Sequence, residues 1–464
     1  MSEMGFKMRN SHKDNFSNNP YNDATYYFNQ FYQVPNAPTT PQPALALGHV
    51  VSNFTNPNYY DKSYPLGPLS NYDKIVSLVN ANSGLFTFDA NTTHLRNDGA
   101  DYDGTERVTA GYLMNSISFG KSRLQTGVRF EATNESYTAN QVQSHRDPVI
   151  KRTIWDNTTP VQNSGSYLNA LPSVQWQYML NQNTNLRATY AMAISRPNFS
   201  DLVPSIQIDP NASPKSVVLG NPALRATHAN DFDVLVEHFF QPLGILQGGF
   251  FYKYLSDPIY NTAQTITSGP FFAQYPNYQL QQSINGPHAH ITGIEAAWEQ
   301  RLSFLPGILN GFGVAANYSY TTSQVSFPDG FSGGRTDRPR LLRQAPNTWN
   351  LGMTYDKARF SMRFGVSHND TNIYAYNYQT TGSDNDPILG LKGPTGDIYL
   401  YAHTQFDIQG SYRMYKGLEL VVSGLNLSNE VFGFYQGSTI YPVQREFYKP
   451  SVIFGMRWSS VSER

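Results

Sequence analysis

An acidic turn at residues 98–104 is the first part of this 464-residue chain whose residue types and spacing could do chemistry. Asp98, Asp101 and Asp103 set carboxylate oxygens at the short intervals that calcium ligands require. The turn does not follow the full EF-hand pattern and has no bidentate Glu at its end. We therefore expect a hydrated acidic loop, with calcium binding as the alternative.

Two histidines, His288 and His290, form a second candidate metal site, because alternate residues of a strand lie on one face. The sequence offers no third ligand at a suitable spacing, so we expect ordinary polar residues at the end of a strand. The chain has no cysteine, which excludes thiolate metal sites and disulfides. We expect no metal site and no cofactor.

A basic loop at residues 333–343 begins with two glycines and carries Arg335, Arg338, Arg340 and Arg343. Positive charge at this density attracts an anionic substrate or lipopolysaccharide. A solvated loop with local ion pairs gives the same pattern. The sequence leaves both interpretations open.

The expected loops further along the chain are rich in tyrosine and asparagine. They include Tyr374, Tyr376, Asn377, Tyr378, Tyr399 and Tyr401. Such side chains suit stacking on sugars or flat ligands. They suit the aromatic belt of a membrane interface equally well. We therefore assign no substrate-binding residue, and the substrate stays unknown.

Catalytic motifs are missing from the sequence: it has no Walker loop, nucleophile elbow, zinc-protease helix or dinucleotide fingerprint. Asp231 and Asp233 are paired carboxylates on one face of an expected strand, where ion pairing is the ordinary role of such residues. The sequence thus predicts no catalytic residue and no enzyme.

The composition excludes further classes of protein. Charged residues are 14% of the chain, against about 25% in an average soluble domain. The net charge of -1 and the lack of a basic stripe give no reason to expect nucleic acid. Mean hydropathy is -0.46, and no stretch reaches the ~18 apolar residues of a transmembrane helix. Transmembrane strands need only ~10 residues with alternate ones apolar, so they remain possible.

Apolar and polar residues alternate with a period of two throughout the chain, which predicts β-strands. In residues 122–131, for example, Leu124, Val128 and Phe130 lie on one face and charged residues on the other. We expect fourteen strands, at 4–14, 107–119, 122–134, 167–180, 184–193, 228–239, 244–255, 288–301, 311–322, 343–355, 359–369, 403–413, 418–426 and 446–458.

Short turns and long polar connections alternate between these strands. We expect the long loops near 15–105, 135–166, 194–227, 256–287, 323–342, 370–402 and 427–445. Tight periplasmic turns opposite long extracellular loops are typical of outer-membrane barrels. The charged face would then line the lumen and the apolar, aromatic face would contact lipid. A soluble propeller or sandwich is the alternative, but the sequence has no repeat of fixed period.

Several segments resemble TonB-dependent receptors in order along the chain. These are 107–133 with Gly127-Val128-Arg129-Phe130-Glu131, 189–199 with Ser195-Arg196-Pro197, Gly220-Asn221-Pro222 through Glu237, 291–298 with Gly293-Ile294-Glu295, Gly424 to Asn429, and the terminal strand ending at Trp458. The resemblance implies an all-β fold, an antiparallel transmembrane β-barrel of 22 strands with a plug in its lumen. This sequence shows about fourteen of those strands and no recognisable plug, TonB box or signal peptide.

The expected organisation therefore has three parts. Residues 1–105 hold a first partial strand and a long extracellular loop, 106–458 the receptor-like barrel, and 459–464 a periplasmic tail. We expect a barrel fragment of an outer-membrane receptor that takes up a carbohydrate or siderophore-like nutrient. Its partners would be lipid, lipopolysaccharide and the nutrient, with the TonB complex reached only through a missing plug. A passive porin, a structural barrel and a gene remnant are the alternatives.

Overall fold

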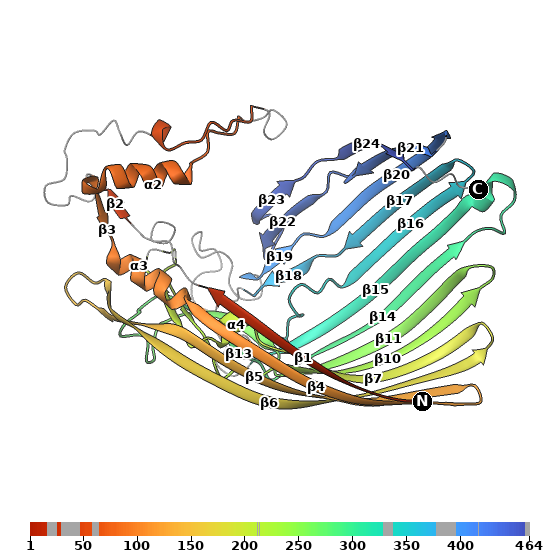
Figure 1. Cartoon of the computed structure of the whole chain (residues 1–464), viewed down its shortest axis with the longest axis horizontal. Coiled ribbons are helices and arrows are strands. Elements are labelled where there is room, and N and C mark those ends of the chain that lie inside the picture. Colours follow the sequence, from red (N-terminus) through yellow and green to blue (C-terminus); the bar gives the residue numbers. More distant parts are fainter. Residues whose placement is uncertain are drawn as a thin grey trace.

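A wide, curved antiparallel sheet dominates the molecule, seen as a computed structural model in Figure 1. The structure describes residues 1–15, 26–28, 47–57, 65–210, 212, 214–327, 337–376, 396–415 and 417–459. Short turns join the strands at one end of the sheet, and the long connections gather at the other end (Figure 1). No helix in these ranges has the length and hydropathy to cross a membrane.

Fourteen long strands build this sheet, as the alternation predicts. They are β1 (Ser2–Asn15), β4 (Tyr102–Phe119), β5 (Ser122–Arg146), β6 (Thr153–Asn181), β7 (Thr184–Ser195), β10 (Thr227–Phe240), β11 (Gly244–Ser256), β14 (His288–Arg301), β15 (Phe312–Ser326), β16 (Asn347–Lys357), β17 (Phe360–Asn369), β20 (His403–Tyr415), β21 (Leu418–Leu425) and β24 (Ser451–Trp458). Each pairs antiparallel with the next in this order.

The turn between β4 and β5 shows how local chemistry sets the register. Phe119 pairs with Ser122, so Gly120 and Lys121 form a two-residue turn. Gly120 has a φ of 53°, a left-handed conformation that glycine adopts without steric cost. Such tight turns match the twist of paired strands.

The strand registers separate an apolar face from a charged face. Phe232 of β10 lies opposite Tyr190 of β7 and Tyr252 of β11. Its neighbour Asp231 points the other way and pairs with Lys253, 3.3 Å between Oδ2 and Nζ. Large apolar side chains of the first face stay exposed, among them Leu113 (58%), Phe250 (50%) and Ile294 (51%). A continuous exposed apolar surface of this size marks contact with lipid or protein.

Strands β5 and β6 correct one expectation, because they continue well into the segment expected as a loop at 135–166. Their pairing extends to Arg146 opposite Thr153. Apolar alternation is lost in this part, where Thr, Ser, Asn and Gln occupy both faces. A hairpin that extends past the exposed apolar surface needs no apolar face, so the sequence pattern ends before the strands do.

The expected terminal strand at 446–458 is also corrected, because it is two strands. β23 (Pro442–Phe447) ends and β24 starts at Ser451. Between them Lys449 has a φ of 61° and Pro450 has no N–H to donate, so the ladder cannot run through.

Further elements occur inside the other expected loops. The first long loop holds β2 (Tyr26–Phe28), η2 (Leu47–His49), α2 (Tyr72–Ala81), η3 (Ser83–Leu85), β3 (Phe86–Phe88), α3 (Ala90–Asn97) and η4 (Asp98–Ala100). Helix α3 begins where Asp89 accepts a hydrogen bond from the backbone N–H of Thr92 at 3.1 Å, satisfying one of the free N–H groups of the first turn. Helix α2 has the same kind of cap at Asn71.

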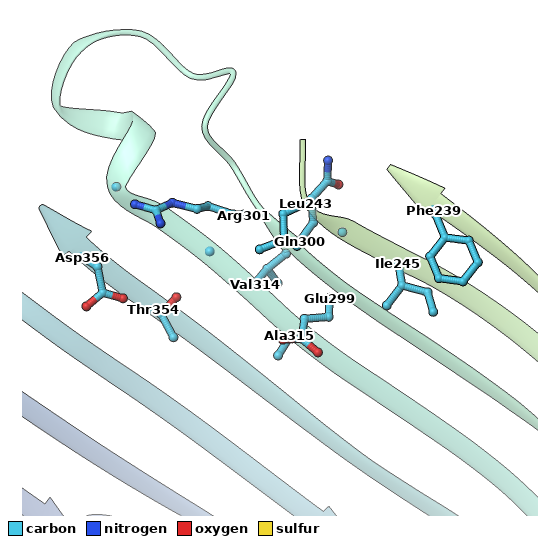
Figure 2. Close-up of a pocket in the computed structure, with 13 residues that line it drawn as sticks. Phe239, Leu243, Ile245, Glu299, Gln300, Arg301, Val314, Ala315, Thr354 and Asp356 are labelled. Atoms are coloured by element: carbon cyan, nitrogen blue, oxygen red, sulfur yellow. The ribbon is translucent and has the colours of Figure 1, made fainter. Parts of the chain in front are cut away.

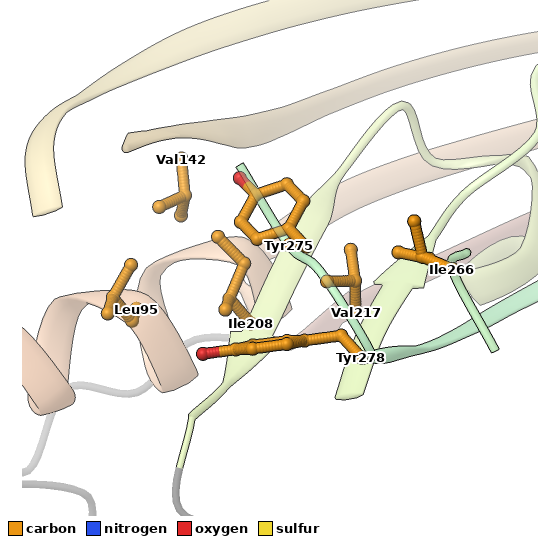
Figure 3. Packing of buried hydrophobic residues seen from close by; sticks show 7 residues of the cluster. All are labelled: Leu95, Val142, Ile208, Val217, Ile266, Tyr275 and Tyr278. Atoms are coloured by element: carbon orange, nitrogen blue, oxygen red, sulfur yellow. The ribbon is translucent and has the colours of Figure 1, made fainter. Parts of the chain in front are cut away.

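A hydrophobic core holds the loop end together (Figure 3). Leu95 of α3 packs with Ile208, Val217 and Tyr278, and each of the four is at most 2% exposed. Ser144 of β5 hydrogen bonds the hydroxyl of another core member, Tyr275, at 2.8 Å. The long connections therefore form a packed layer on the end of the sheet.

Candidate ligand-binding site

The segment after β7 folds back onto the charged face of the sheet, which we call the lumenal face. Arg196 Nη2 donates to Glu131 Oε2 at 2.5 Å, and its Nε lies 3.7 Å from Glu106 Oε2. The two carboxylates are 12% and 8% exposed, and Arg9 of β1 also binds Glu106 at 2.6 Å. Buried carboxylates need a cation, so Arg196 fixes this segment to β4 and β5.

Helix α4 (Phe199–Leu202) follows directly and packs on β5. Leu202 and Val203 are buried with Tyr137 in one cluster. A Cβ at Gly220 would lie 1.5 Å from the carbonyl oxygen of Val203, so only glycine allows this close approach. Asn221 donates from Nδ2 to the carbonyl of Ser283 at 2.9 Å. The Gly-Asn-Pro motif thus joins α4 to the next layer of strands.

That layer is a set of short strands inside the expected loops. They are β8 (Ile206–Asp209), β9 (Ser216–Leu219), β12 (Ile259–Thr265) and β13 (Gln279–Asn285). β9 pairs antiparallel with β8 and parallel with β13, which pairs antiparallel with β12. The layer lies across the loop end of the sheet and rests on the core of Figure 3.

A hollow of about 790 Å³ lies between this layer and the segments at 342–343 and 374–376. We call it the polar hollow, because amide and hydroxyl side chains dominate its lining. These are Asn15, Ser200, Ser205, Gln207, Asn261, Thr262, Gln281, Gln282 and Ser283, with the tyrosines Tyr102, Tyr374 and Tyr376. Among the described residues, the charged side chains of the lining are Asp201 and Arg343.

A second hollow of about 540 Å³ adjoins it, and we call it the aromatic hollow. It lies between the ends of β16, β17 and β20 and a small sheet of β18 (Asn372–Ala375), β19 (Ile398–Leu400), β22 (Val431–Gln436) and β23. Its rings are Tyr374, Tyr401, Phe432 and Phe434. Thr348 of β16 and its register partner Asn369 of β17 also line it, and both lie on the lumenal face.

Arg343 and Tyr374 line both hollows and form the wall between them. The guanidinium of Arg343 lies 4.9 Å from the centre of the Tyr374 ring, a cation–π contact. Tyr374 also packs on Phe434, with ring centres 4.6 Å apart. The backbone N–H of Arg343 donates to Ile373 at 2.7 Å, which fixes the segment. Arg343 forms no ion pair with any described residue.

The floor of the aromatic hollow is held by Asp370, directly after β17. Its Oδ2 accepts from the Asn347 side chain at 2.5 Å, and its Oδ1 lies 3.1 Å from His368 Nε2. The hydrogen bond from Asn347 holds the pKa of the Asp370 carboxyl below its usual range, and His368 acts in the same direction. The carboxylate thus ties β16 to β17 beneath the site.

Two expected binding groups can be compared with this site. Of the basic loop, Arg343 lines the hollows, Arg338 and Arg340 do not, and Arg335 lies outside the described residues. Of the tyrosine-rich set, Tyr374, Tyr376 and Tyr401 line a hollow. Tyr399 stacks on Tyr435 at 5.3 Å and lines neither, and Asn377 and Tyr378 lie outside the described residues. The glutamines of β13 were missed, because they lie in an expected loop.

The acidic turn does not gather its carboxylates. Asp98 begins η4 and accepts from Thr158 at 2.5 Å, with His94 Nδ1 at 2.9 Å. Asp103 lies in β4 beside His12, 2.6 Å away. Asp98 is thus a packed residue rather than part of a hydrated loop.

One histidine of the pair, His288, has structural contacts instead. His288 stacks on Tyr254, with ring centres 6.0 Å apart, and its Nε2 lies 3.1 Å from Ser326 Oγ. Within the described ranges, no group of three His, Cys, Asp or Glu side chains could hold a metal ion.

A further hollow of about 450 Å³ lies at the short-turn end of the sheet (Figure 2). Glu299, Arg301, Thr354 and Asp356 line it from the lumenal face, together with Leu243 of a turn. It is at the opposite end of the strands from the loops, and no sequence motif points to it.

The chain belongs to the TonB-dependent receptor-like β-barrel family, whose model matches residues 4–427. The resemblance read from the sequence is therefore confirmed, as is the antiparallel barrel-type fold. The family consists of receptors and transporters of the outer membrane rather than enzymes. No curated protein sequence matches the chain.

Solved structures support the fold. The ferric-catecholate import receptor Fiu from K12 E. coli has a TM-score of 0.53 at 14% identity, covering 78% of this chain and 46% of its own. The siderophore receptor PiuA from Acinetobacter baumannii has a TM-score of 0.50 at 14% identity, covering 77% and 44%. The chain thus spans less than half the length of these receptors.

Proposed function

We propose that the chain is part of an outer-membrane receptor that captures a small nutrient at its loop end and passes it along the lumenal face. The observation that carries the proposal is the pair of hollows that share Arg343 and Tyr374. Both are within the ~300–1,000 Å³ that small-molecule sites occupy. Thr348 and Asn369 of the lumenal face line the aromatic hollow, and residues of the long connections line both hollows.

A receptor is favoured over a passive porin by the segments that cover the lumenal face. Arg196 and α4 bind residues of β4 and β5 that would otherwise line an open channel. The core of Figure 3 makes this cover a packed layer. A layer of this kind serves capture of a ligand better than free diffusion. In the whole receptor, the TonB complex would act through a plug domain, and the outer face would contact lipid and lipopolysaccharide.

Location and folding test this proposal. The full chain, preceded by an outer-membrane-directing signal peptide, is expressed in a Gram-negative host and fractionated. We expect it in the outer-membrane fraction, with gel migration that differs before and after boiling. A chain that stays in the soluble fraction would contradict the proposal.

A further inference from the structure

We infer that the ligand of this site is a neutral, polyhydroxylated molecule, namely an oligosaccharide that spans both hollows. The inference rests on the proposed function and names the ligand class of the same site. Charge, hydrogen-bonding groups, aromatic rings and size each support it.

Charge argues against a multiply anionic ligand. Asp201 is already engaged, since Ser283 Oγ donates to its Oδ1 and Asn198 Nδ2 to its Oδ2, both at 3.0 Å. Among the described lining residues, Arg343 is the one arginine or lysine of the two hollows. Removing several anionic groups from water costs several kcal/mol for each unpaired charge. A neutral ligand avoids that cost.

The polar hollow presents hydrogen-bonding groups that are fixed in place. Gln282 Nε2 donates to the carbonyl of Gly220 at 3.2 Å, and Gln281 Nε2 donates to Gln279 at 3.1 Å. In the described part of the chain their Oε1 atoms have no partner. Hydroxyl groups both donate and accept, so they can bind the amide and hydroxyl groups of this lining. A sugar offers several such hydroxyls on each ring.

Aromatic rings supply the complementary apolar surface. Tyr374 and Phe432 are 38% and 37% exposed, although both belong to a packed cluster with Phe434. The C–H face of a pyranose packs on such a ring, whereas its hydroxyls point outward. Tyr374 lies between the two hollows, so one sugar ring can stack on it while its neighbours enter the polar hollow.

Size decides between one ring and several. The hollows measure about 790 and 540 Å³, and each by itself has the volume of a site for a drug-sized molecule. Because they meet at Tyr374 and Arg343, a chain of sugar units fills them better than a monosaccharide does.

The test is calorimetric titration of the full chain, purified from the outer-membrane fraction in detergent. The probes are maltohexaose, cellohexaose, xylohexaose and chitohexaose, with ferric citrate as the anionic probe. We expect at least one hexasaccharide to bind. Tyr374→Ala should then weaken binding about tenfold, and Gln282→Ala should weaken it by a smaller factor. The matched control Tyr441→Ala, a tyrosine that lines neither hollow, should bind like the unmodified chain.

Two results would overturn the inference while leaving the proposed function intact. One is binding of ferric citrate that Arg343→Ala abolishes, with no hexasaccharide bound. The other is failure of all four hexasaccharides to bind a chain that shows the heat-dependent shift in the outer-membrane fraction. Failure to reach that membrane would instead contradict the proposed function.

Discussion

Single residues hold the segment after β7 on the lumenal face of the sheet. Arg196 is the residue whose substitution tests this most directly. Its guanidinium binds Glu131 and lies near Glu106, whose side chains are almost buried and which also pair with Arg129 and Arg9. We expect Arg196→Ala to lower the free energy of unfolding by about 1.5–3 kcal/mol, because it removes charge-assisted hydrogen bonds, while Glu131 keeps Arg129 at 2.7 Å and Glu106 keeps Arg9 at 2.6 Å. Urea titration of the folded, heat-shiftable species measures this change.

A matched substitution separates burial from charge. Arg225 pairs with Asp257 at 2.5 Å, but its side chain is 69% exposed. Arg225→Ala should therefore change stability by about 0–1 kcal/mol. Equal effects of the two substitutions would show that the Arg196 contacts carry no special weight.

Asp370, below the aromatic hollow, makes the free energy of unfolding depend on pH. Its pKa is lowered in the folded chain, chiefly by the hydrogen bond from Asn347. The folded state therefore binds this proton less readily than the unfolded state, whose Asp has a pKa of about 3.9. The stabilisation is fully present above that value and is lost as pH falls through the lowered pKa.

Asp370→Asn should remove this dependence. Between pH 6 and pH 3, the urea midpoint of the unmodified chain should fall more steeply than that of the variant. Parallel curves for the two proteins would mean that Asp370 contributes nothing to the acid sensitivity.

At the scale of the strand, the two faces of β11 predict opposite effects of an added arginine on stability. Phe250 lies on the apolar face near the middle of β11, half exposed. Arginine there would sit in hydrocarbon, and we expect Phe250→Arg to cost about 2–4 kcal/mol. Gln247→Arg places the same side chain on the lumenal face of the same strand, next to Glu237, and should be tolerated. Outer-membrane yield and urea stability of both variants measure the difference.

Strands with one exposed apolar face could be predicted from sequence, and strands without such a face could not. Alternation around Phe232 and Phe250 separates an apolar face from a polar face, and a strand that keeps one such face must hold a period of two. Water or the packed loop layer contacts each face of the second half of β5, the first half of β6 and the glutamine-bearing strand β13. Their residues follow no period of two in hydropathy, so the sequence reads as a loop.

The same limit applies to the site. Arg343 and Tyr374 were candidates because of their residue types, in a basic loop and a tyrosine-rich loop. Their contact joins residues 31 positions apart through the small sheet, and local sequence carries no signal for that pairing. Gln281 and Gln282 lie among ordinary polar residues of an expected loop, and only the fold brings them to Tyr374.

At the scale of the whole molecule, each of the two outer strands of the sheet has one edge without a paired strand among the strands that the structure describes. β1 pairs with β4, β24 pairs with β21, and no register among the described residues joins β1 to β24. Phe6 and Phe454 on these strands are 73% and 76% exposed. An unpaired backbone group in hydrocarbon costs several kcal/mol, so each outer strand requires a neighbour there.

Disulfide trapping tests whether the two outer strands are neighbours. Because the chain has no native cysteine, only the introduced cysteines can form a disulfide. Met8 and Thr109 are register partners on β1 and β4, so cysteines at both positions should cross-link within one chain. Cysteines at Met8 and Phe454 should not cross-link within one chain, because the structure keeps β1 and β24 as separate edges. An intrachain disulfide at 8 and 454 would show that the fourteen strands close on themselves. If chains recovered from the outer membrane form the disulfide between positions 8 and 109 but none between 8 and 454, other strands cover both edges.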